Sequence, residues 1–166
     1  PGGTLNTASL IQIDNSRLTV SGGLTFSRVA DNDYRNPLND FNGDLFRADG
    51  TGSTLDLTSI QNIQFGGGSG RRFFNVVATN NGVVNLSGLQ TLSVSPGQDD
   101  VLTFLPNAGG TILLNNLQQI TNAGNGNERV RFEAVGATFN IPVLTVANRV
   151  EFVPSIGGII NAPQLA

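Results

Sequence analysis

The densest group of potential metal ligands in the sequence lies between residues 30 and 44. Its carboxylate and amide oxygens come from Asp31, Asp33, Asp40, Asn42 and Asp44. The run DFNGD at 40–44 places three of them at alternate positions, and hard cations such as calcium prefer oxygen ligands. The pattern therefore predicts a calcium site. A solvated turn is the alternative, because acidic, asparagine-rich loops also fit that description.

Paired carboxylates are the remaining chemistry that the sequence offers. Histidine and cysteine are absent, which removes the commonest general base, the thiol nucleophile and most zinc ligands. Two pairs of acids remain, Asp99 with Asp100 and Glu133 with Glu151. The surrounding outward positions carry mainly amides and hydroxyls, without an aromatic platform for a sugar. We therefore expect no enzymatic activity, no catalytic residues and no cofactor other than calcium.

A repeating frame of apolar residues must position these side chains. The frame is clearest at residues 53–65, STLDLTSIQNIQF, where apolar residues alternate on both sides of Thr58 and Ser59. Positions equivalent to Ile60 are Leu10, Val29, Leu89, Leu117, Leu144 and Leu165. They recur every 19 to 31 residues, a period typical of solenoid proteins, in which stacked units bury one continuous core.

The alternation within each unit has period two, which indicates strands and not helices. From residue 45 onward each unit reads as an entry strand, a glycine-containing turn, an apolar-polar-apolar triplet and a final strand. We therefore predict an all-β, right-handed parallel β-helix of about seven triangular coils. It forms a single domain over residues 1–166, expected to belong to a longer chain or assembly. The lapse of the pattern at about 30–44 predicts a loop insertion after the second coil.

The middle residues of the triplets form a column that we expect to face outward. They are Asn6, Thr25, Asp56, Asn85, Leu113, Asn140 and Asn161. Amide side chains stacked along a solenoid can hydrogen-bond to one another, which favours a structural role. The alternative is a flat polar face that binds a glycan or ice.

Charge and hydropathy exclude two classes of partner. Charged residues make up 13% of the chain and the net charge is -3, which is not the basic footprint that nucleic-acid binding requires. No apolar run approaches the roughly 18 residues of a membrane-spanning helix. We expect no nucleic-acid partner and no membrane span.

Two segments carry a resemblance to known repeats: LFRADGTGSTLDLTSIQNIQF at residues 45–65 and VVATNNGVVNLSGLQTL at residues 76–92. They resemble the parallel β-solenoid repeats of large bacterial cell-surface and secreted proteins of the adhesin-like and matrix type. The resemblance implies an extracellular or cell-surface location and a structural or adhesive role in a surface layer, fibre or matrix.

The ends of such a solenoid expose unpaired strands. We therefore expect end-to-end association with itself or with neighbouring repeats, and surface glycans are further candidate partners. The alternative function is a carbohydrate-binding or polysaccharide-cleaving β-helix domain.

Overall fold

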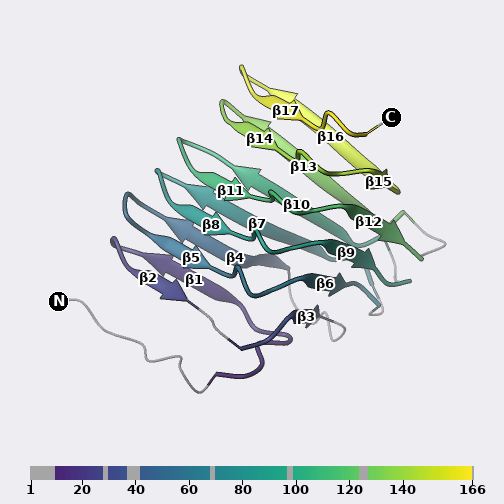
Figure 1. Cartoon of the computed structure of the whole chain (residues 1–166), viewed down its shortest axis with the longest axis horizontal. Helices are drawn as coiled ribbons and strands as arrows, with labels where there is room; N and C mark the ends of the chain where they lie inside the picture. The colour runs from purple at the N-terminus through teal and green to yellow at the C-terminus, as the bar shows by residue number, and fades with distance from the viewer. Residues whose placement is uncertain are drawn as a thin grey trace.

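The computed structural model is a stack of short strands, and the part of the chain that it describes contains no helix. The structure describes residues 10–27, 30–36, 42–67, 70–96, 99–123 and 127–165. Successive turns follow one another in chain order, from purple near the N-terminus to yellow near the C-terminus (Figure 1). The predicted all-β parallel solenoid is confirmed.

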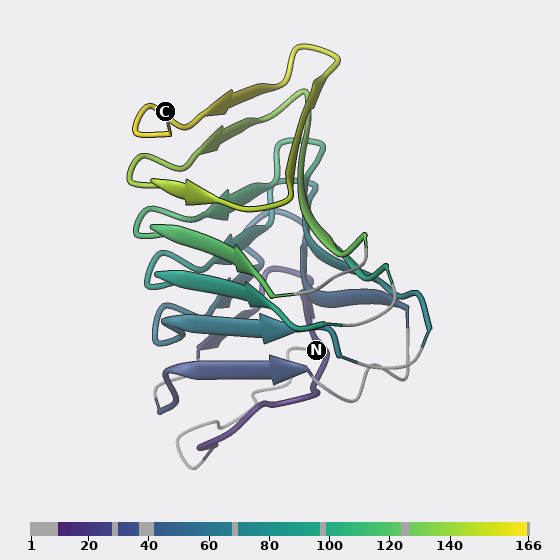
Figure 2. The ribbon, with the colours of Figure 1, turned by 90° about the vertical axis from the view of Figure 1, so that its right-hand side faces the viewer.

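Three sheets form the sides of the solenoid, and every strand pairing is parallel. Sheet A contains β1 (Leu18–Ser21), β4 (Gly43–Asp49), β7 (Phe73–Thr79), β10 (Val101–Pro106), β13 (Arg129–Val135) and β16 (Val150–Ser155). Sheet B contains β2 (Thr25–Ser27), β5 (Thr54–Asp56), β8 (Val83–Asn85) and β11 (Thr111–Leu113). Sheet C contains β3 (Asp33–Asn36), β6 (Asn62–Phe65), β9 (Thr91–Val94), β12 (Gln119–Asn122) and β15 (Val146–Ala147), which lie one above another in Figure 2.

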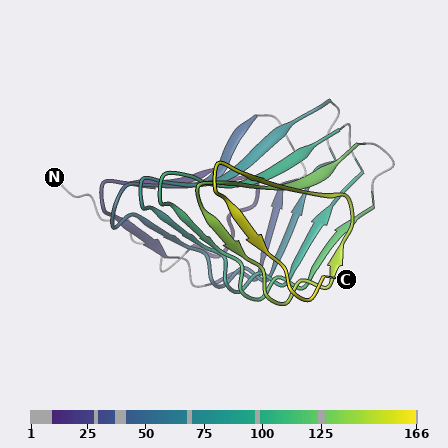
Figure 3. The ribbon, with the colours of Figure 1, turned by 90° about the horizontal axis from the view of Figure 1, so that it is seen from above.

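Strands β1 to β12 give about four turns, because each turn supplies one strand to each of sheets A, B and C. Sheet D, formed by β14 (Thr138–Asn140) and β17 (Ile159–Asn161), replaces sheet B in the last part of the chain. Seen from above, the turns repeat the same path (Figure 3). The predicted seven coils are not confirmed. Leu10 lies in a segment without strands, and Val29 lies outside the described residues.

The predicted loop insertion at 30–44 is also not confirmed. Residues Asp33–Asn36 form β3, which pairs with β6, and β4 already begins at Gly43. The sequence pattern missed β3 because its inward residues are Tyr34 and Asn36, both buried, in place of two aliphatic residues. The neighbouring residues 37–41 lie outside the described part of the chain.

The apolar frame of the later units is confirmed. Ile60, Leu89, Leu117 and Leu144 are all fully buried in one core. Each closes the same tight turn by donating its backbone N–H to the carbonyl three residues earlier, and Leu165 does so as well. Burial of this column supplies the hydrophobic stabilisation that no single turn could provide.

Four glycines limit how closely the turns approach. At each of them a Cβ atom would collide with a backbone carbonyl of the preceding turn. The pairs are Gly82 on Ala48, Gly88 on Thr58, Gly110 on Ala78 and Gly158 on Ala134. Glycine is required here by this close approach. At the adjacent Gly109 and Gly157 it is favoured by positive φ angles of 80° and 77°.

Candidate functional site

The predicted calcium ligands Asp31 and Asp33 lie on the sheet C side. Asp31 accepts the backbone N–H of Asp33 at 3.0 Å through Oδ1. The Asp33 carboxylate lies 2.8 Å from the Arg35 guanidinium and accepts the Asn62 amide at 2.9 Å. Both acids therefore already have hydrogen-bond donors from the protein.

The other predicted ligands, Asn42 and Asp44, lie on the sheet A side. Asn42 accepts the backbone N–H of Phe73 at 2.7 Å, and Asp44 lies 3.1 Å from the Arg47 guanidinium. Asp40 lies outside the described residues. Within the described residues, no three acidic side chains gather as a metal site would require. Calcium binding stays a prediction.

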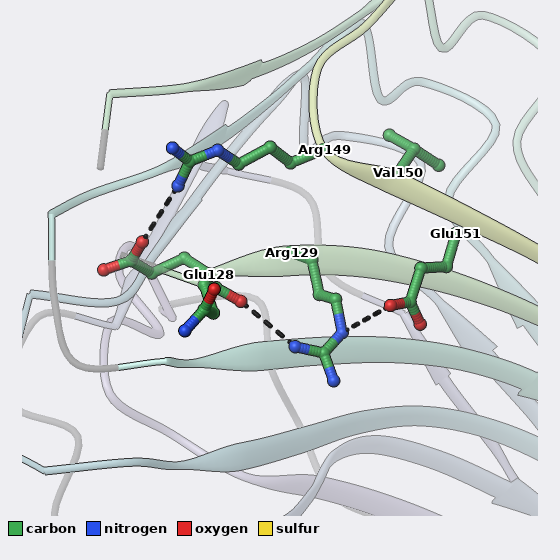
Figure 4. Close-up of a pocket in the computed structure, with 6 residues that line it drawn as sticks. Glu128, Arg129, Arg149, Val150 and Glu151 are labelled. Carbon is green, nitrogen blue, oxygen red and sulfur yellow. Dashed lines mark hydrogen bonds and ion pairs between the residues drawn. The ribbon is translucent and has the colours of Figure 1, made fainter. Parts of the chain in front are cut away.

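A hollow of about 420 Å³ lies where β13 and β16 begin (Figure 4). It is lined by Asn127, Glu128, Arg129, Arg149, Val150 and Glu151. Arg149 extends to Glu128, with Nη1 3.4 Å from Oε2, and Arg129 extends to Glu151, with Nε 2.8 Å from Oε1. The Arg129 Nε–H does not point at that oxygen, so this contact is an ion pair and not a hydrogen bond.

The predicted acid pair Glu133 and Glu151 is brought together around Arg131. The Arg131 Nε lies 3.0 Å from Glu133 Oε2, and its Nη1 lies 3.8 Å from Glu151 Oε2. Arg131 and Glu151 are also direct neighbours in the strand register. The side chains form an alternating ion-pair network on the outside of sheet A, with a guanidinium beside each carboxylate.

The predicted pair Asp99 and Asp100 is split between two environments. Asp99 accepts the backbone and side-chain N–H groups of Asn127, both at 3.1 Å. Asp100 is fully buried and accepts the backbone N–H of Arg72 at 2.9 Å. Burial raises the pKa of the Asp100 carboxyl, and the charge of Glu128 adds to this. The Arg72 N–H and its positive charge act in the opposite direction.

Glu128 is the site residue that the sequence pattern missed. It is fully buried and occupies the position of Asp100 one turn later, because Val101 pairs with Arg129. Each of the two acids directly precedes the entry strand of its turn, and that recurrence was the available signal. The resulting corner holds two buried carboxylates, stacked one turn apart.

The predicted amide column is only partly a ladder. Asn161 donates to Asn140 through their side chains at 2.8 Å, as a ladder requires. Asp56 and Asn85 accept backbone N–H groups two residues later at 3.2 Å, so they stabilise corners. The outer face of sheet C has a further polar hollow of about 280 Å³. Its lining residues are Asp33, Tyr34, Arg35, Asn62, Gln64, Thr91 and Ser93.

The C-terminal end of the solenoid is apolar. A row of aromatic rings runs along the core to this end. The ring centroids are 5.1 Å apart between Phe104 and Phe132 and 5.6 Å apart between Phe132 and Phe152, with nearly parallel planes. Phe152 contributes to a hollow of about 380 Å³ that we call the floor. The floor is lined by Phe152, Pro154, Ile160, Ala162 and Leu165, all uncharged.

No protein-family model, curated protein or solved structure matches this chain.

The resemblance to bacterial surface repeats therefore stays a prediction. No helix in the described residues is long and apolar enough to cross a membrane. The most distinctive surface is the floor, because its residues come from β16 of sheet A, from β17 of sheet D and from the segment after β17, and its larger side chains are only partly buried.

Proposed function

We propose that this chain is a structural or adhesive β-solenoid module of an extracellular surface layer, fibre or matrix. In this proposal the solenoid winds right-handed and associates by stacking its C-terminal end on a further turn. The observation that carries the proposal is the floor. Three of its residues, Phe152, Ile160 and Leu165, pack against the hydrophobic core and are only partly buried.

The last turn has the composition of an internal turn. Phe152 pairs with Phe132 in the register of sheet A, and it continues the row of stacked rings. An internal turn would have its core residues covered by the next turn. This supports the proposal that the floor receives a further turn of the same type.

Pro154 does not argue against a following turn. Proline lacks a backbone N–H and therefore weakens pairing at a strand edge. Pro106 occupies the same position in β10, two residues after the stacked ring of Phe104. The described pairing of β10 with β13 stops at Phe104, yet β13 still stacks on β10. A turn with proline at this position is thus compatible with another turn above it.

Analytical ultracentrifugation of the chain over a wide concentration range tests the proposal. We expect association that weakens at least tenfold in Leu165→Glu, which places a charge on the floor. Gln164→Glu is the matched control, since it adds the same charge one residue away on an exposed side chain. A chain that stays monomeric at millimolar concentration would rule out association through its ends.

The second candidate function is a carbohydrate-binding or polysaccharide-cleaving β-helix. It is favoured by the hollow on sheet C, where charged side chains of β3 lie beside the amide and hydroxyl side chains of β6 and β9. Such groups provide the hydrogen bonds that sugar hydroxyls need. Binding on a glycan array that is lost in Gln64→Ala, with the fold retained, would support this function over purely structural stacking.

A further inference from the structure

Uncharged polar side chains form three columns over the outer face of sheet C and the corner that leads into it. The first, which we call the glutamine column, stacks through backbone hydrogen bonds and holds Gln61, Gln90 and Gln118. The two outward columns of the sheet hold Asn62, Thr91 and Gln119, and Gln64, Ser93 and Thr121. All three columns therefore consist of amides and hydroxyls over three consecutive turns, whose strands lie one above another in Figure 2.

The outer face of sheet A differs, because its polar groups satisfy one another. Arg47, for example, lies 3.1 Å from Asp44 and 3.0 Å from Asp49. The side chains of the glutamine column and of Gln119 make no hydrogen bond in the part of the chain that the structure describes, although they stack one turn apart. Each amide has two donor hydrogens and an acceptor oxygen. These groups are therefore free to bond to a ligand.

The hollow of about 280 Å³ lies over the same face. It covers β3, β6 and β9 and two outward positions on each strand. With about 4.8 Å between strands and about 3.3 Å per residue, its base is on the order of 10 Å by 7 Å. Tyr34 is the aromatic residue of its lining, and it is fully buried. The base can therefore hold a short stretch of a sugar chain, bound through hydrogen bonds and not through ring stacking.

Charge selects the class of sugar. Asp33 and Arg35 are the charged residues of the lining, and their side chains lie 2.8 Å apart, so their charges cancel. An acidic polysaccharide would lose hydration of its carboxylates without gaining an unpaired cation, which is unfavourable. Sugar hydroxyls both donate and accept, and so match amide and hydroxyl side chains. The face is therefore complementary to a neutral chain.

We infer that the outer face of sheet C binds a neutral polysaccharide. The hollow holds part of the chain, and Gln119 with the glutamine column contacts its continuation over the neighbouring strands. The inference rests on the adhesive role in the proposed function and names its partner. Hydrogen bonds at an exposed surface hold each sugar unit weakly, whereas contacts repeated over several turns add up in a long chain. Binding therefore depends on chain length.

Biolayer interferometry on immobilised polysaccharides tests the inference. The probes are neutral dextran, galactomannan and hydroxyethyl cellulose, with acidic polygalacturonate for comparison. At least one neutral polymer should bind the chain, and a tetrasaccharide of the same composition should compete at least tenfold more weakly per sugar unit. Binding to polygalacturonate that equals or exceeds binding to every neutral polymer, or binding to none of the four, would overturn the inference.

Variants of sheet C test the location of the site. Thr91→Val removes a hydroxyl from the hollow and keeps the shape of the side chain, and Gln119→Ala removes an amide from β12. Each should weaken binding about threefold or more through the loss of a hydrogen bond, with an unchanged Tm. The matched controls are Thr111→Val on sheet B and Asn107→Ala at the corner between sheets A and B, both exposed. Polysaccharide binding that neither sheet C variant weakens would place the site elsewhere.

Ultracentrifugation without polysaccharide separates this inference from the proposed end-to-end association. Thr91→Val should leave that association unchanged, because Thr91 lies on the side of the solenoid and not at its end. A chain that associates but binds no neutral polysaccharide overturns the inference and leaves the structural role intact. A chain that binds the polysaccharide but stays monomeric supports the inference and overturns association through the ends.

Discussion

The two ends of the solenoid bury their inward residues to different extents. In the first turn, Val20, Phe26 and Tyr34 are all at most 9% exposed, and only Leu18, the register equivalent of Phe152, is partly buried. In the last turn, Phe152 and Ile160 face the same core but are only partly buried. The strands of the two turns are of the same type, so the difference arises from what lies beyond them.

Hydrogen bonds at the N-terminal end explain the difference. Tyr34 donates its hydroxyl to the Ser16 carbonyl at 2.9 Å, and residues 14 and 15 bond to the backbone of Arg35. The edge of β3 is thereby occupied by the chain itself, as protected sheet edges usually are. The first turn of the described residues is therefore closed by hydrogen bonds from the preceding segment.

The largest expected effect is the removal of a buried ring from the N-terminal turn. Tyr34→Ala should lower the free energy of unfolding by about 3–5 kcal/mol, because a cavity forms and the Ser16 carbonyl loses its donor. Phe152→Ala should cost roughly 1–2 kcal/mol in the monomer, since that ring is only partly buried. Urea denaturation at low protein concentration measures both. Equal losses would contradict the difference between the ends.

A smaller change isolates the hydrogen bond of the N-terminal turn. Tyr34→Phe keeps the ring and removes only the hydroxyl, so the free energy of unfolding should fall by about 1 kcal/mol. Tyr34 and Phe46 pack edge to face with centroids 4.9 Å apart, and this contact should remain. A loss as large as that of Tyr34→Ala would show that the ring contributes nothing beyond the hydroxyl.

The pH dependence of the free energy of unfolding tests the carboxyl group of Asp100, which lies at neither end of the solenoid. Because burial raises the pKa of Asp100 above its unfolded value, the folded state binds this proton more tightly. Its contribution to stability is therefore greatest below the unfolded pKa of about 4 and falls as pH rises through the raised folded pKa.

Asp100→Asn should flatten this part of the curve of unfolding free energy against pH. Asp49 is the control, because its pKa shift has the opposite sign. The side-chain hydrogen bond from Asn80, assisted by Arg47, lowers its pKa, so its stabilisation is present above pH 4 and lost as pH falls. A curve for Asp100→Asn that matches the wild type above pH 4 would contradict the assignment to Asp100.

The smallest expected effect concerns calcium near the N-terminal turn. Ligand binding to the folded state raises Tm according to its concentration relative to Kd. We predict a rise of a few degrees with calcium over chelator, and a smaller rise in Asp33→Asn. Asp56→Asn, outside the predicted ligands, is the control. Identical melting curves with calcium and with chelator would argue against the site.

The sequence predicted the fold where the inward residues are aliphatic. Leu55, Leu57 and Ile60 follow the same alternation as Val84, Leu86 and Leu89, and all are buried. It did not predict β3, because buried Tyr34 and Asn36 break the aliphatic pattern. The Tyr34 hydroxyl bonds to the Ser16 carbonyl, and a partner from another part of the chain is not visible in the local alternation.

The candidate surfaces were less predictable than the frame. Asp99 and Asp100 are adjacent in sequence, but the backbone directs one to Asn127 and buries the other. Residues that line the floor, such as Phe152, have the same types as covered residues in earlier turns, so residue type alone does not reveal them.

The contact of Gly82, Gly110 and Gly158 with the carbonyls of the preceding turn has a consequence for how such a molecule can change its length. Any side chain at these positions would force two turns apart, so single substitutions there are poorly tolerated. Duplication or loss of a whole turn adds no side chain at these positions and moves the two ends by one strand spacing, about 4.8 Å. The length of the solenoid can therefore change in steps of one whole turn, while its first and last turns stay unchanged.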